Sequence, residues 1–310
     1  MELEDYIRKL LPYYGFPKNV RITRIRSGFN RAVFEIDGTD FDMDKFIIKI
    51  CTDITREKEV ENEIEFYKNN HFRFTPSSFR FIDDTSKEKV PFVYTIESYI
   101  NGETLFSKWG CMSDEERHEA LEELVSILKQ IHSRKIPGYY DEFNPQTLID
   151  GFYKDLDRCR NQKLFSYEQL EHLWRIKDIF PKYLEGAKTG FIHGDIHFDN
   201  VIVTPDNSLK LIDFENYGVS ILDKEFDEIN RMCKSPQSFT TRGQINEKDF
   251  QGIMPTMESL YPELCEDPNY RKRLIIYDCI NAIRWIQMYP DCQRYYDTLF
   301  GDSQKLIRKK

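Results

Sequence analysis

The chain has 310 residues, of which 40% are hydrophobic and 31% charged, and a formal net charge of −9. This composition is typical of a globular protein, and the negative balance argues against a nucleic-acid partner while mildly favouring cationic small molecules. No apolar run approaches the ~20 residues that span a bilayer, so we expect no membrane segment. Seven scattered cysteines without a Cys-x-x-Cys pair, and a start that lacks an apolar signal region, predict reduced thiols and a cytoplasmic protein.

The first hundred residues predict a short helix followed by a small sheet. Apolar residues recur at helical spacing over residues 1–14, and five runs with strand character follow at 21–25, 32–36, 46–50, 79–82 and 92–99. A helix over 55–70 separates the third run from the fourth. Lys49 stands alone among apolar residues in the third run. Because a buried ammonium without a partner is costly, Lys49 must meet an anion, unless it faces water from an edge strand.

Beyond residue 101 the periodicity is mostly helical. A capping box at 113–116 opens the first long helix. Amphipathic segments predict helices at 113–132, 151–159, 167–183, 221–233, 247–260 and 269–289. We find no internal repeat, low-complexity tract or linker that would divide this region further.

The most informative stretch runs from residue 191 to 214. Asp195 follows an apolar run, Asn200 comes five residues later, and a turn-rich segment at 204–208 separates two short strand-like runs that end at Asp213. Because a hairpin would join the ends of these runs, we expect Asn200 and Asp213 to lie side by side. Their oxygens suit Mg²⁺, which leaves Asp195 to orient a hydroxyl and accept its proton. These are the parts needed for phosphoryl transfer.

This stretch allows two other interpretations. Acids in hairpin turns are often solvated turn-formers. A zinc site is the second alternative, with ligands at alternate positions: His193, Asp195 and His197. No further His or Cys cluster lies nearby in the sequence to complete such a site. The ordered set of Asp195, Asn200 and Asp213 is more specific than either alternative, so we favour a kinase-type site.

Two segments carry a resemblance to a known family: His193–Asn200 (HGDIHFDN) and Ile212–Phe214 (IDF). Together they resemble the signature of the aminoglycoside phosphotransferase family, small-molecule relatives of the protein kinases. The spacing from Asp to Asn equals that of the kinase catalytic loop. Gly194 replaces the arginine of protein kinases, and Glu215 replaces a glycine; both departures are normal for the small-molecule branch.

The resemblance implies an α+β, protein-kinase-like bilobal fold. Its N-lobe would be a small five-stranded antiparallel sheet, and its C-lobe would be mainly helical. A hinge is expected in the segment 96–105. We therefore expect residues 1–101 to form the nucleotide-binding N-lobe and residues 102–310 to form the catalytic and substrate-binding C-lobe.

The resemblance also implies residue roles, with ATP or GTP as phosphoryl donor and Mg²⁺ as cofactor. Lys49 would bind the α- and β-phosphates and pair with Glu63, or with Glu59 as the fallback. The hinge would bind the base through backbone atoms, and a shift of frame by one residue would bring in Glu97. The expected nucleotide-binding residues are Ser27, Gly28, Lys49, Glu63, Ser98 and Ile100. The expected metal ligands are Asn200 and Asp213, and the expected catalytic base is Asp195.

Two further sets of residues receive supporting roles from the same resemblance. His132 would close its helix as a structural residue, and either Asp223 or Asp227 would anchor the catalytic loop. The acceptor is expected to be a cationic hydroxylated small molecule, most simply an aminoglycoside antibiotic, as in a resistance enzyme. A metabolic kinase for choline, homoserine or a sugar, or a nucleotide-binding pseudokinase, are the alternatives. The candidate acceptor-binding acids are Glu263, Glu266 and Asp267, with Glu258 and Asp278 nearby in the chain.

Overall fold

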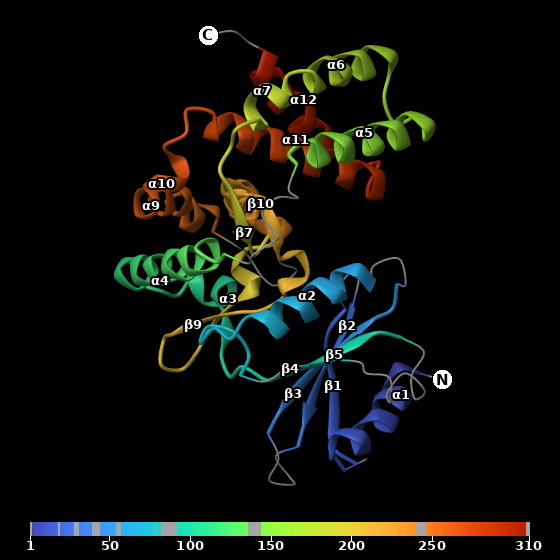
Figure 1. The fold of residues 1–310 in the computed structure, drawn as a ribbon, viewed down its shortest axis with the longest axis vertical. Coiled ribbons are helices and arrows are strands. Elements are labelled where there is room, and N and C mark those ends of the chain that lie inside the picture. Colours follow the sequence, from blue (N-terminus) through green and yellow to red (C-terminus); the bar gives the residue numbers. More distant parts are fainter. Residues whose placement is uncertain are drawn as a thin grey trace. The chain divides into compact units, whose positions relative to one another are not determined.

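The computed structural model of the protein describes residues 2–17, 19–27, 31–38, 44–53, 57–77, 79–81, 92–135, 144–239 and 246–307. The chain forms two compact units, coloured along the sequence in Figure 1. The first comprises residues 1–108 and 198–217, and the second comprises residues 109–197 and 218–310. The hairpin that contains Asn200 and Asp213 therefore groups with the N-terminal residues, whereas Asp195 groups with the helices.

The first unit contains two sheets and a few helices. Its elements are α1 (Leu3–Leu10), β1 (Arg21–Ser27), β2 (Arg31–Asp37), β3 (Phe46–Cys51), α2 (Glu57–Asn69), β4 (Phe79–Phe81), β5 (Tyr94–Ser98), β6 (Glu103–Thr104), α3 (Leu105–Trp109), β8 (Val201–Val203) and β9 (Leu209–Leu211). The larger sheet has the order β1-β2-β3-β5-β4, and all its pairs are antiparallel. This confirms the predicted five-stranded sheet. The smaller sheet has the order β6-β8-β9.

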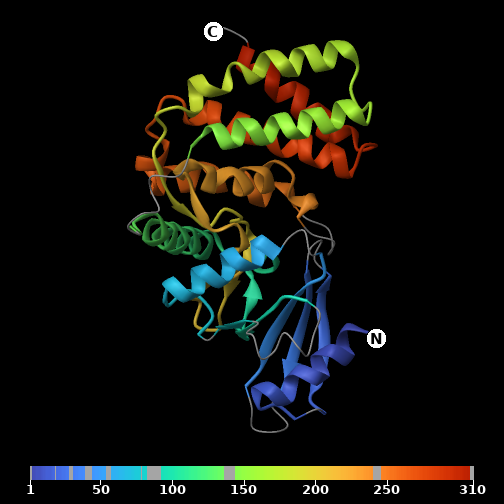
Figure 2. The same cartoon turned by 45° about the vertical axis from the view of Figure 1, so that its right-hand side comes forward.

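Alternation along the strands gives the larger sheet two different faces. Ile48 and Ile50 of β3 join Ile7 and Leu10 of α1 in a buried apolar core. Helix α1 accordingly lies along the sheet, as Figure 2 shows. Since successive side chains of a strand point to opposite faces, Lys49 points away from this core.

The other face of the sheet carries charge. The register pairs Val33 with Lys49 and Ile47 with Glu97, which places Arg31, Lys49 and Glu97 on one diagonal across β2, β3 and β5. Because β3 lies in the middle of the sheet, the edge-strand explanation for Lys49 is wrong. A buried polar face on a central strand needs partners from elsewhere in the unit.

The second unit is mainly helical. Its elements are α4 (Asp114–His132), α5 (Gln146–Asn161), α6 (Tyr167–Lys177), α7 (Phe180–Leu184), β7 (Thr189–Ile192), β10 (Gly218–Ile221), α8 (Asp227–Lys234), α9 (Ile253–Leu260), α10 (Pro262–Cys265), α11 (Tyr270–Met288) and α12 (Gln293–Ile307). Strands β7 and β10 pair antiparallel. The predicted capping box is present, since the Ser113 hydroxyl accepts from the Glu116 amide. The α+β class predicted from the sequence is confirmed.

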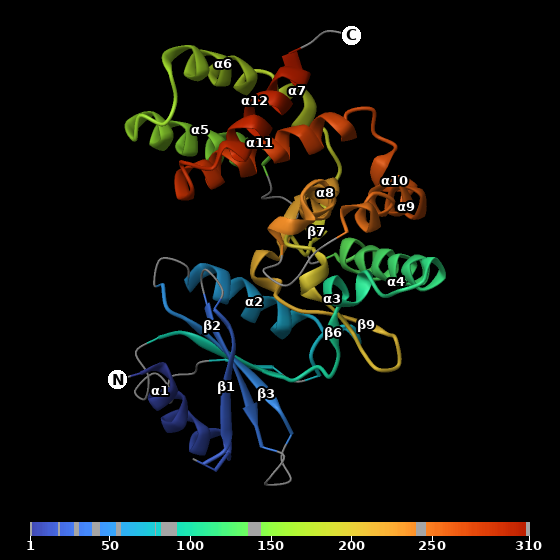
Figure 3. The same cartoon turned by 180° about the vertical axis from the view of Figure 1, so that it is seen from behind.

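The structure departs from the predicted helices in three places. The segment 167–183 divides into α6 and α7. Pro181 lies in the first turn of α7, where a proline is tolerated, whereas inside one continuous helix it would remove a backbone hydrogen bond. Helix α12 was not predicted, and it packs along α11 (Figure 3). Strand β10 ends at Ile221, and a 3-10 helix over Leu222–Phe226 follows it, so the helix predicted from residue 221 begins at Asp227 as α8. Among the described residues, no helix is both long enough and apolar enough to cross a membrane.

Candidate active site

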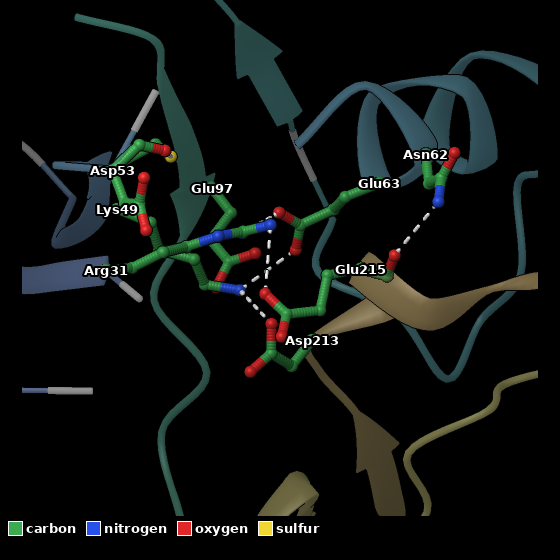
Figure 4. Close-up of polar contacts among 9 residues, drawn as sticks. Arg31, Lys49, Asp53, Asn62, Glu63, Glu97, Asp213 and Glu215 are labelled. Carbon is green, nitrogen blue, oxygen red and sulfur yellow. Dashed lines mark hydrogen bonds and ion pairs between the residues drawn. The ribbon is translucent and has the colours of Figure 1, made fainter. Parts of the chain in front are cut away.

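Lys49 lies at the centre of a buried ionic cluster in the first unit (Figure 4). Its Nζ is 3.0 Å from Oε1 of Glu63 on α2, 3.2 Å from Oε1 of Glu97 on β5 and 3.9 Å from Oδ1 of Asp213. Although burial lowers it, these carboxylates raise the pKa of Lys49 above its usual value, so the ammonium stays charged. The expected contact between Lys49 and Glu63 is present.

A second cation, Arg31 at the start of β2, shares Glu63 with Lys49. The Nη1 of Arg31 donates to Oε2 of Glu63, and its Nη2 lies 3.1 Å from Oε2 of Glu215. Arg31 is only 6% exposed, and the surrounding carboxylates raise its pKa despite its burial. Each oxygen of Glu63 therefore has its own cation. Sequence analysis had not assigned Arg31 to the site.

Glu97 belongs to the cluster through its side chain and not through the hinge backbone. Its Oε1 contacts Lys49, while its Oε2 is buried without a hydrogen-bond partner among the described residues. Burial, opposed by Lys49, raises the pKa of Glu97 to about 7. Four carboxylates, those of Glu63, Glu97, Asp213 and Glu215, thus face two cations. A bound metal cation would relieve this excess of carboxylates over cations.

The hairpin of β8 and β9 places Asn200 and Asp213 side by side, as expected. The amide of Ile212 donates to the carbonyl of Asn200 at 3.1 Å. Asp213 adopts a left-handed backbone conformation, with φ 70° and ψ 61°, which is uncommon for a residue other than glycine. Strained residues of this kind cluster at functional sites, and Asp213 here turns toward Lys49 (Figure 4).

Helix α2 holds the turn that follows Asp213. The rings of Phe66 and Phe214 stack at a centroid distance of 3.7 Å with planes 7° apart. The side-chain amide of Asn62 donates to the carbonyl of Glu215 at 3.3 Å. Together with the ion pair from Arg31, these contacts fix the turn from three directions.

Asn200 and Asp213 fit the expected Mg²⁺ by the chemistry of their donors, one amide oxygen and one carboxylate. Two such ligands suffice, because Mg²⁺ usually keeps several waters and binds phosphate oxygens of the substrate. In the described ranges, no group of three or more His, Cys, Asp or Glu residues forms a preassembled metal site. A metal bound between Asn200 and Asp213 would complete its shell with water and phosphate.

The other expected nucleotide contacts lie at strand ends. Ser27 ends β1, and Ser98 ends β5. The backbone amide of Tyr99 donates a hydrogen bond to the carbonyl of Lys45, the residue before β3, at 3.1 Å. Ile100 is half-buried two residues beyond β5. Gly28 lies outside the described residues, so the proposed phosphate loop stays a prediction.

In the second unit, Asp195 lies in the loop after β7. Its amide donates to Nδ1 of His193 at 3.3 Å, and its Oδ1 lies 4.0 Å from Nε2 of His197. The side chain is 25% exposed, so the carboxylate can be reached by a ligand. The preceding Gly194 has a φ of 82°, which glycine adopts without strain and other residues rarely do.

Glu225 anchors this loop, which corrects the prediction that Asp223 or Asp227 would do so. Its Oε2 accepts from the His193 amide at 2.7 Å, and its Oε1 accepts from the Gly194 amide at 3.0 Å. Despite burial, its hydrogen-bond partners lower the pKa of Glu225, so it stays ionised. A buried carboxylate that accepts two consecutive amides fixes the path of the backbone into Asp195.

Glu225 is supported in turn from α4. Nε2 of His132 lies 3.1 Å from Oε2 of Glu225, and Nδ1 of His132 lies 3.0 Å from the hydroxyl of Tyr261. These contacts agree with the structural role expected for His132. Asp223 and Asp227 accept hydrogen bonds from side chains of α11. They therefore hold the helical unit together and not the loop.

The acids expected to bind the acceptor are mostly engaged by the protein itself. The ion pairs are Glu258 with Arg271, Glu263 with Lys129, Asp267 with Arg273 and Asp278 with Lys234. Glu266 is exposed at the end of α10. Carboxylates that are already neutralised by a basic side chain attract a cationic acceptor less strongly than the acidic sequence suggests.

Comparison with known proteins shows the family of the chain. A model of the phosphotransferase enzyme family matches residues 21–225, about two thirds of the chain. The chain belongs to this family. A relative in Mycoplasma pneumoniae, an uncharacterised protein MG356 homologue, is 28% identical over 185 residues, which cover 57% of this chain and 52% of the relative. The chain thus spans about half the length of that curated relative.

Solved structures share the fold over nearly the whole chain. The gentamicin complex of APH(2″)-IIa is 17% identical with a TM-score of 0.66, covering 100% of this chain and 97% of that one. A ternary complex of the same enzyme with streptomycin and ATP has an equal TM-score of 0.66, at 17% identity over 100% and 98% of the two chains. Choline kinase LicA from Streptococcus pneumoniae is 14% identical with a TM-score of 0.59, over 98% and 97%. Identities this low establish the fold alone.

The family match includes the proposed catalytic and phosphate-binding residues and leaves out the last helices. Lys49, Asp195, Asn200 and Asp213 all lie inside the matched residues 21–225. Helices α8 to α12 lie beyond them.

Proposed function

We propose that the protein transfers the γ-phosphoryl group of a nucleoside triphosphate to a hydroxyl group of a small molecule. The observation that carries this proposal is the convergence of Lys49 and Asp213, whose charged atoms are 3.9 Å apart. A fixed cation beside a carboxylate suits a triphosphate bound as its metal complex, because the cation takes phosphate oxygens and the carboxylate takes the metal. Membership of the phosphotransferase enzyme family supports the reaction class.

In this proposal Lys49, fixed by Glu63, neutralises charge on the α- and β-phosphates. Asn200 and Asp213 hold Mg²⁺, which when bound reduces the charge on the phosphate oxygens. The donor is ATP or GTP. The remaining proposed nucleotide contacts are Ser27, Gly28, Ser98 and Ile100.

Asp195 is the proposed general base. The acceptor hydroxyl gives its proton to the Asp195 carboxylate while its oxygen forms a bond to the γ-phosphorus. The bond from that phosphorus to the bridging oxygen breaks, and the nucleoside diphosphate leaves with the electron pair. Glu225 keeps Asp195 in place through the amides of His193 and Gly194. Positioning of this kind supplies much of the rate in phosphoryl transfer.

The acceptor we propose is a cationic alcohol. An aminoglycoside antibiotic is the first candidate, drawn from the family resemblance, and would make the protein a resistance enzyme. A choline-type amino alcohol is the second candidate. One observation favours it: four of the five acids expected to bind a polycation are ion-paired within the protein. All seven cysteines are free, which suits a reducing compartment such as the cytoplasm.

The test is an acceptor panel in a coupled assay for nucleoside diphosphate release, run with ATP and with GTP. The panel contains gentamicin, streptomycin, choline, homoserine and a neutral sugar, each at low and moderate salt. Transfer to a cationic alcohol, with a KM that rises with salt, supports the proposal, because salt screens the attraction between opposite charges. Release that is the same in Asp195→Asn as in the unmodified protein would contradict it.

A further inference from the structure

Glu97 has no role in the proposed reaction, although it contacts Lys49 directly (Figure 4). Its Oε1 lies 3.2 Å from Nζ of Lys49, and its Oε2 has no hydrogen-bond partner among the described residues. The residue is only 3% exposed, so water does not readily replace the missing partner. A buried carboxylate with one unsatisfied oxygen costs free energy, and such a group calls for a functional explanation.

Glu63, the glutamate of α2 that contacts the same ammonium, has a partner for each oxygen. Its Oε1 accepts from Lys49 at 3.0 Å, and its Oε2 accepts from Arg31. If Lys49 turned to another anion, Glu63 would still have Arg31. Glu97 would then have no cation within contact among the described residues. The cost of drawing Lys49 away therefore falls mainly on Glu97.

The number of donors on Lys49 limits how many anions it can hold. An ammonium group has three N–H donors. In the structure Nζ lies 3.0 Å from Glu63 and 3.2 Å from Glu97, while Asp213 is farther away at 3.9 Å. If Glu63 keeps its donor, contacts to the α- and β-phosphates of a nucleotide need the other two. Glu97 must then give up its contact with Lys49 when the nucleotide binds.

A second polar group on this face of β5 also lacks a partner. Thr95 lies opposite Lys49 in the register of β3 and β5, and the alternation of side chains places it on the same face as Glu97. Its hydroxyl is buried without a hydrogen-bond partner in the part of the chain that the structure describes. The arrangement that holds Lys49 against Glu97 therefore leaves two polar groups of one strand unsatisfied.

From these contacts we infer that Glu97 competes with the nucleotide phosphates for Lys49 and thereby weakens nucleotide binding. This inference rests on the proposed phosphotransferase function and adds a residue that sets the affinity for its donor. A weaker hold on the phosphates also speeds release of the nucleoside diphosphate. Product release limits the turnover of many enzymes, so the competition would serve the reaction.

A binding measurement on Glu97→Gln tests this inference separately from catalysis. Isothermal titration calorimetry would compare ATP with adenosine, or GTP with guanosine if the protein prefers GTP. We expect the triphosphate to bind the variant at least about 10-fold more tightly than the unmodified protein, the order of a hydrogen bond to a charged group that no longer has to be broken. The nucleoside has no phosphates, so its affinity should not change.

Three further variants locate the effect. Glu97→Met has an unbranched side chain without charge, should show the same gain, and serves if the glutamine variant folds poorly. Glu35→Gln is the matched control, because Glu35 of β2 pairs with Lys45, 3.2 Å away, and should leave the affinity for ATP unchanged. In a Lys49→Met background, Glu97→Gln should lose most of its gain, because no donor is released.

Three results would overturn the inference while leaving the proposed function intact. The first is unchanged or weaker triphosphate binding by both Glu97 variants, since a residue that merely positions Lys49 would give a loss when replaced. The second is an equal gain for the triphosphate and its nucleoside, and the third is an undiminished gain in the Lys49→Met background. Failure of every one of these proteins to bind ATP or GTP would instead contradict the proposed function, and the inference with it.

Discussion

Arg31 offers the sharpest test of how the ionic cluster is held together. Replacing it by methionine keeps an unbranched side chain but leaves Glu63 and Glu215 without its charge. Removal of one partner of a buried ion pair costs about 3–5 kcal/mol, because the remaining charge is uncompensated. In the variant, Glu63 still has the Lys49 ammonium at 3.0 Å, and the Glu215 side chain is 13% exposed to water. We therefore expect a loss of unfolding free energy at the lower end of this range, about 3 kcal/mol.

The control is a second arginine on the same sheet. Arg21 of β1 is 67% exposed and pairs with the buried Asp37, which keeps a second cation, Lys45, at 3.3 Å. Because Asp37 stays paired and the Arg21 side chain is mostly in solvent, Arg21→Met should cost no more than about 1 kcal/mol. The comparison separates the effect of burial from that of losing an arginine.

The assay is urea unfolding of the variants, combined with hydrogen exchange resolved by peptide. Arg31→Met should speed exchange in α2 and in the segment after Asp213, which Arg31 links through Glu63 and Glu215. In a double-mutant cycle, Arg31→Met and Glu215→Gln should be less than additive by about 0.5–3 kcal/mol, the range for residues in contact. Additive effects, or a cost for Arg31→Met no larger than for Arg21→Met, would refute this reasoning.

Three further predictions follow from the site. Asp213→Ala should abolish Mg²⁺-dependent nucleotide binding, whereas Asn200→Ala should weaken it and be partly rescued by high Mg²⁺, because a carboxylate stabilises the ion more than an amide does. Nucleotide titrations with and without Mg²⁺ test this, and binding by Asp213→Ala as tight as that of the unmodified protein would disprove the metal assignment. Glu225→Gln should lower kcat by up to about 10²-fold, the scale of a base misplaced by about 1 Å, with nucleotide KM unchanged. A change in nucleotide KM alone would speak against a positioning role for Glu225. Glu228→Gln should gain stability relative to the unmodified protein as pH rises from about 5 to about 9, as measured by thermal unfolding.

The sign of the last prediction follows from proton binding. The folded state keeps the proton on Glu228 up to about pH 8, whereas the unfolded chain loses it near the ordinary glutamate pKa of 4.5. Between these values the folded state binds more protons, so its stability falls as pH rises. Glutamine does not titrate and escapes this loss. An exposed glutamate on α6, Glu171, provides the control variant, and a pH-independent difference for Glu228→Gln would contradict the prediction.

Local sequence signals were enough to find the parts of the site that lie close together in the chain. The turn residues at 204–208 and the two short strand runs predicted the hairpin that pairs Asn200 with Asp213. The isolated Lys49 in an apolar strand predicted a buried cation, and the contact with Glu63 agrees with it. The roles of these residues in nucleotide and metal binding stay predictions.

The residues that sequence analysis missed depend on distant partners. Arg31 stands at a strand start, where an arginine usually faces solvent, and its partner Glu215 is far away in the chain. Glu97 was expected only as an alternative contact of the hinge. Its sequence did carry a signal for the cluster, because Glu97, like Lys49, is a charged residue that alternates with apolar residues in a strand. Glu225 competes with acids two residues to either side, and only the fold decides which of the three meets the loop.

The acidic cluster near the C-terminus illustrates the opposite error. A run of acids in a sequence does not reveal the basic side chains that other helices bring to it, such as Lys129 and Arg273. Nor does the sequence reveal that the Arg231 guanidinium lies over both Phe239 and Trp285, because the three residues belong to separate elements. The partners of a charged residue therefore follow from the fold and not from its neighbours in the chain.

The central claim is that Asp195 accepts the proton of an acceptor hydroxyl during phosphoryl transfer. The most direct test is the turnover of Asp195→Asn with saturating nucleotide and the best acceptor, together with nucleotide affinity measured by titration. The variant keeps the shape of the side chain and loses its charge and basicity. Turnover should fall by about 10²–10⁴ with nucleotide affinity unchanged, the magnitude typical of a lost general base. Turnover close to that of the unmodified protein would contradict the account.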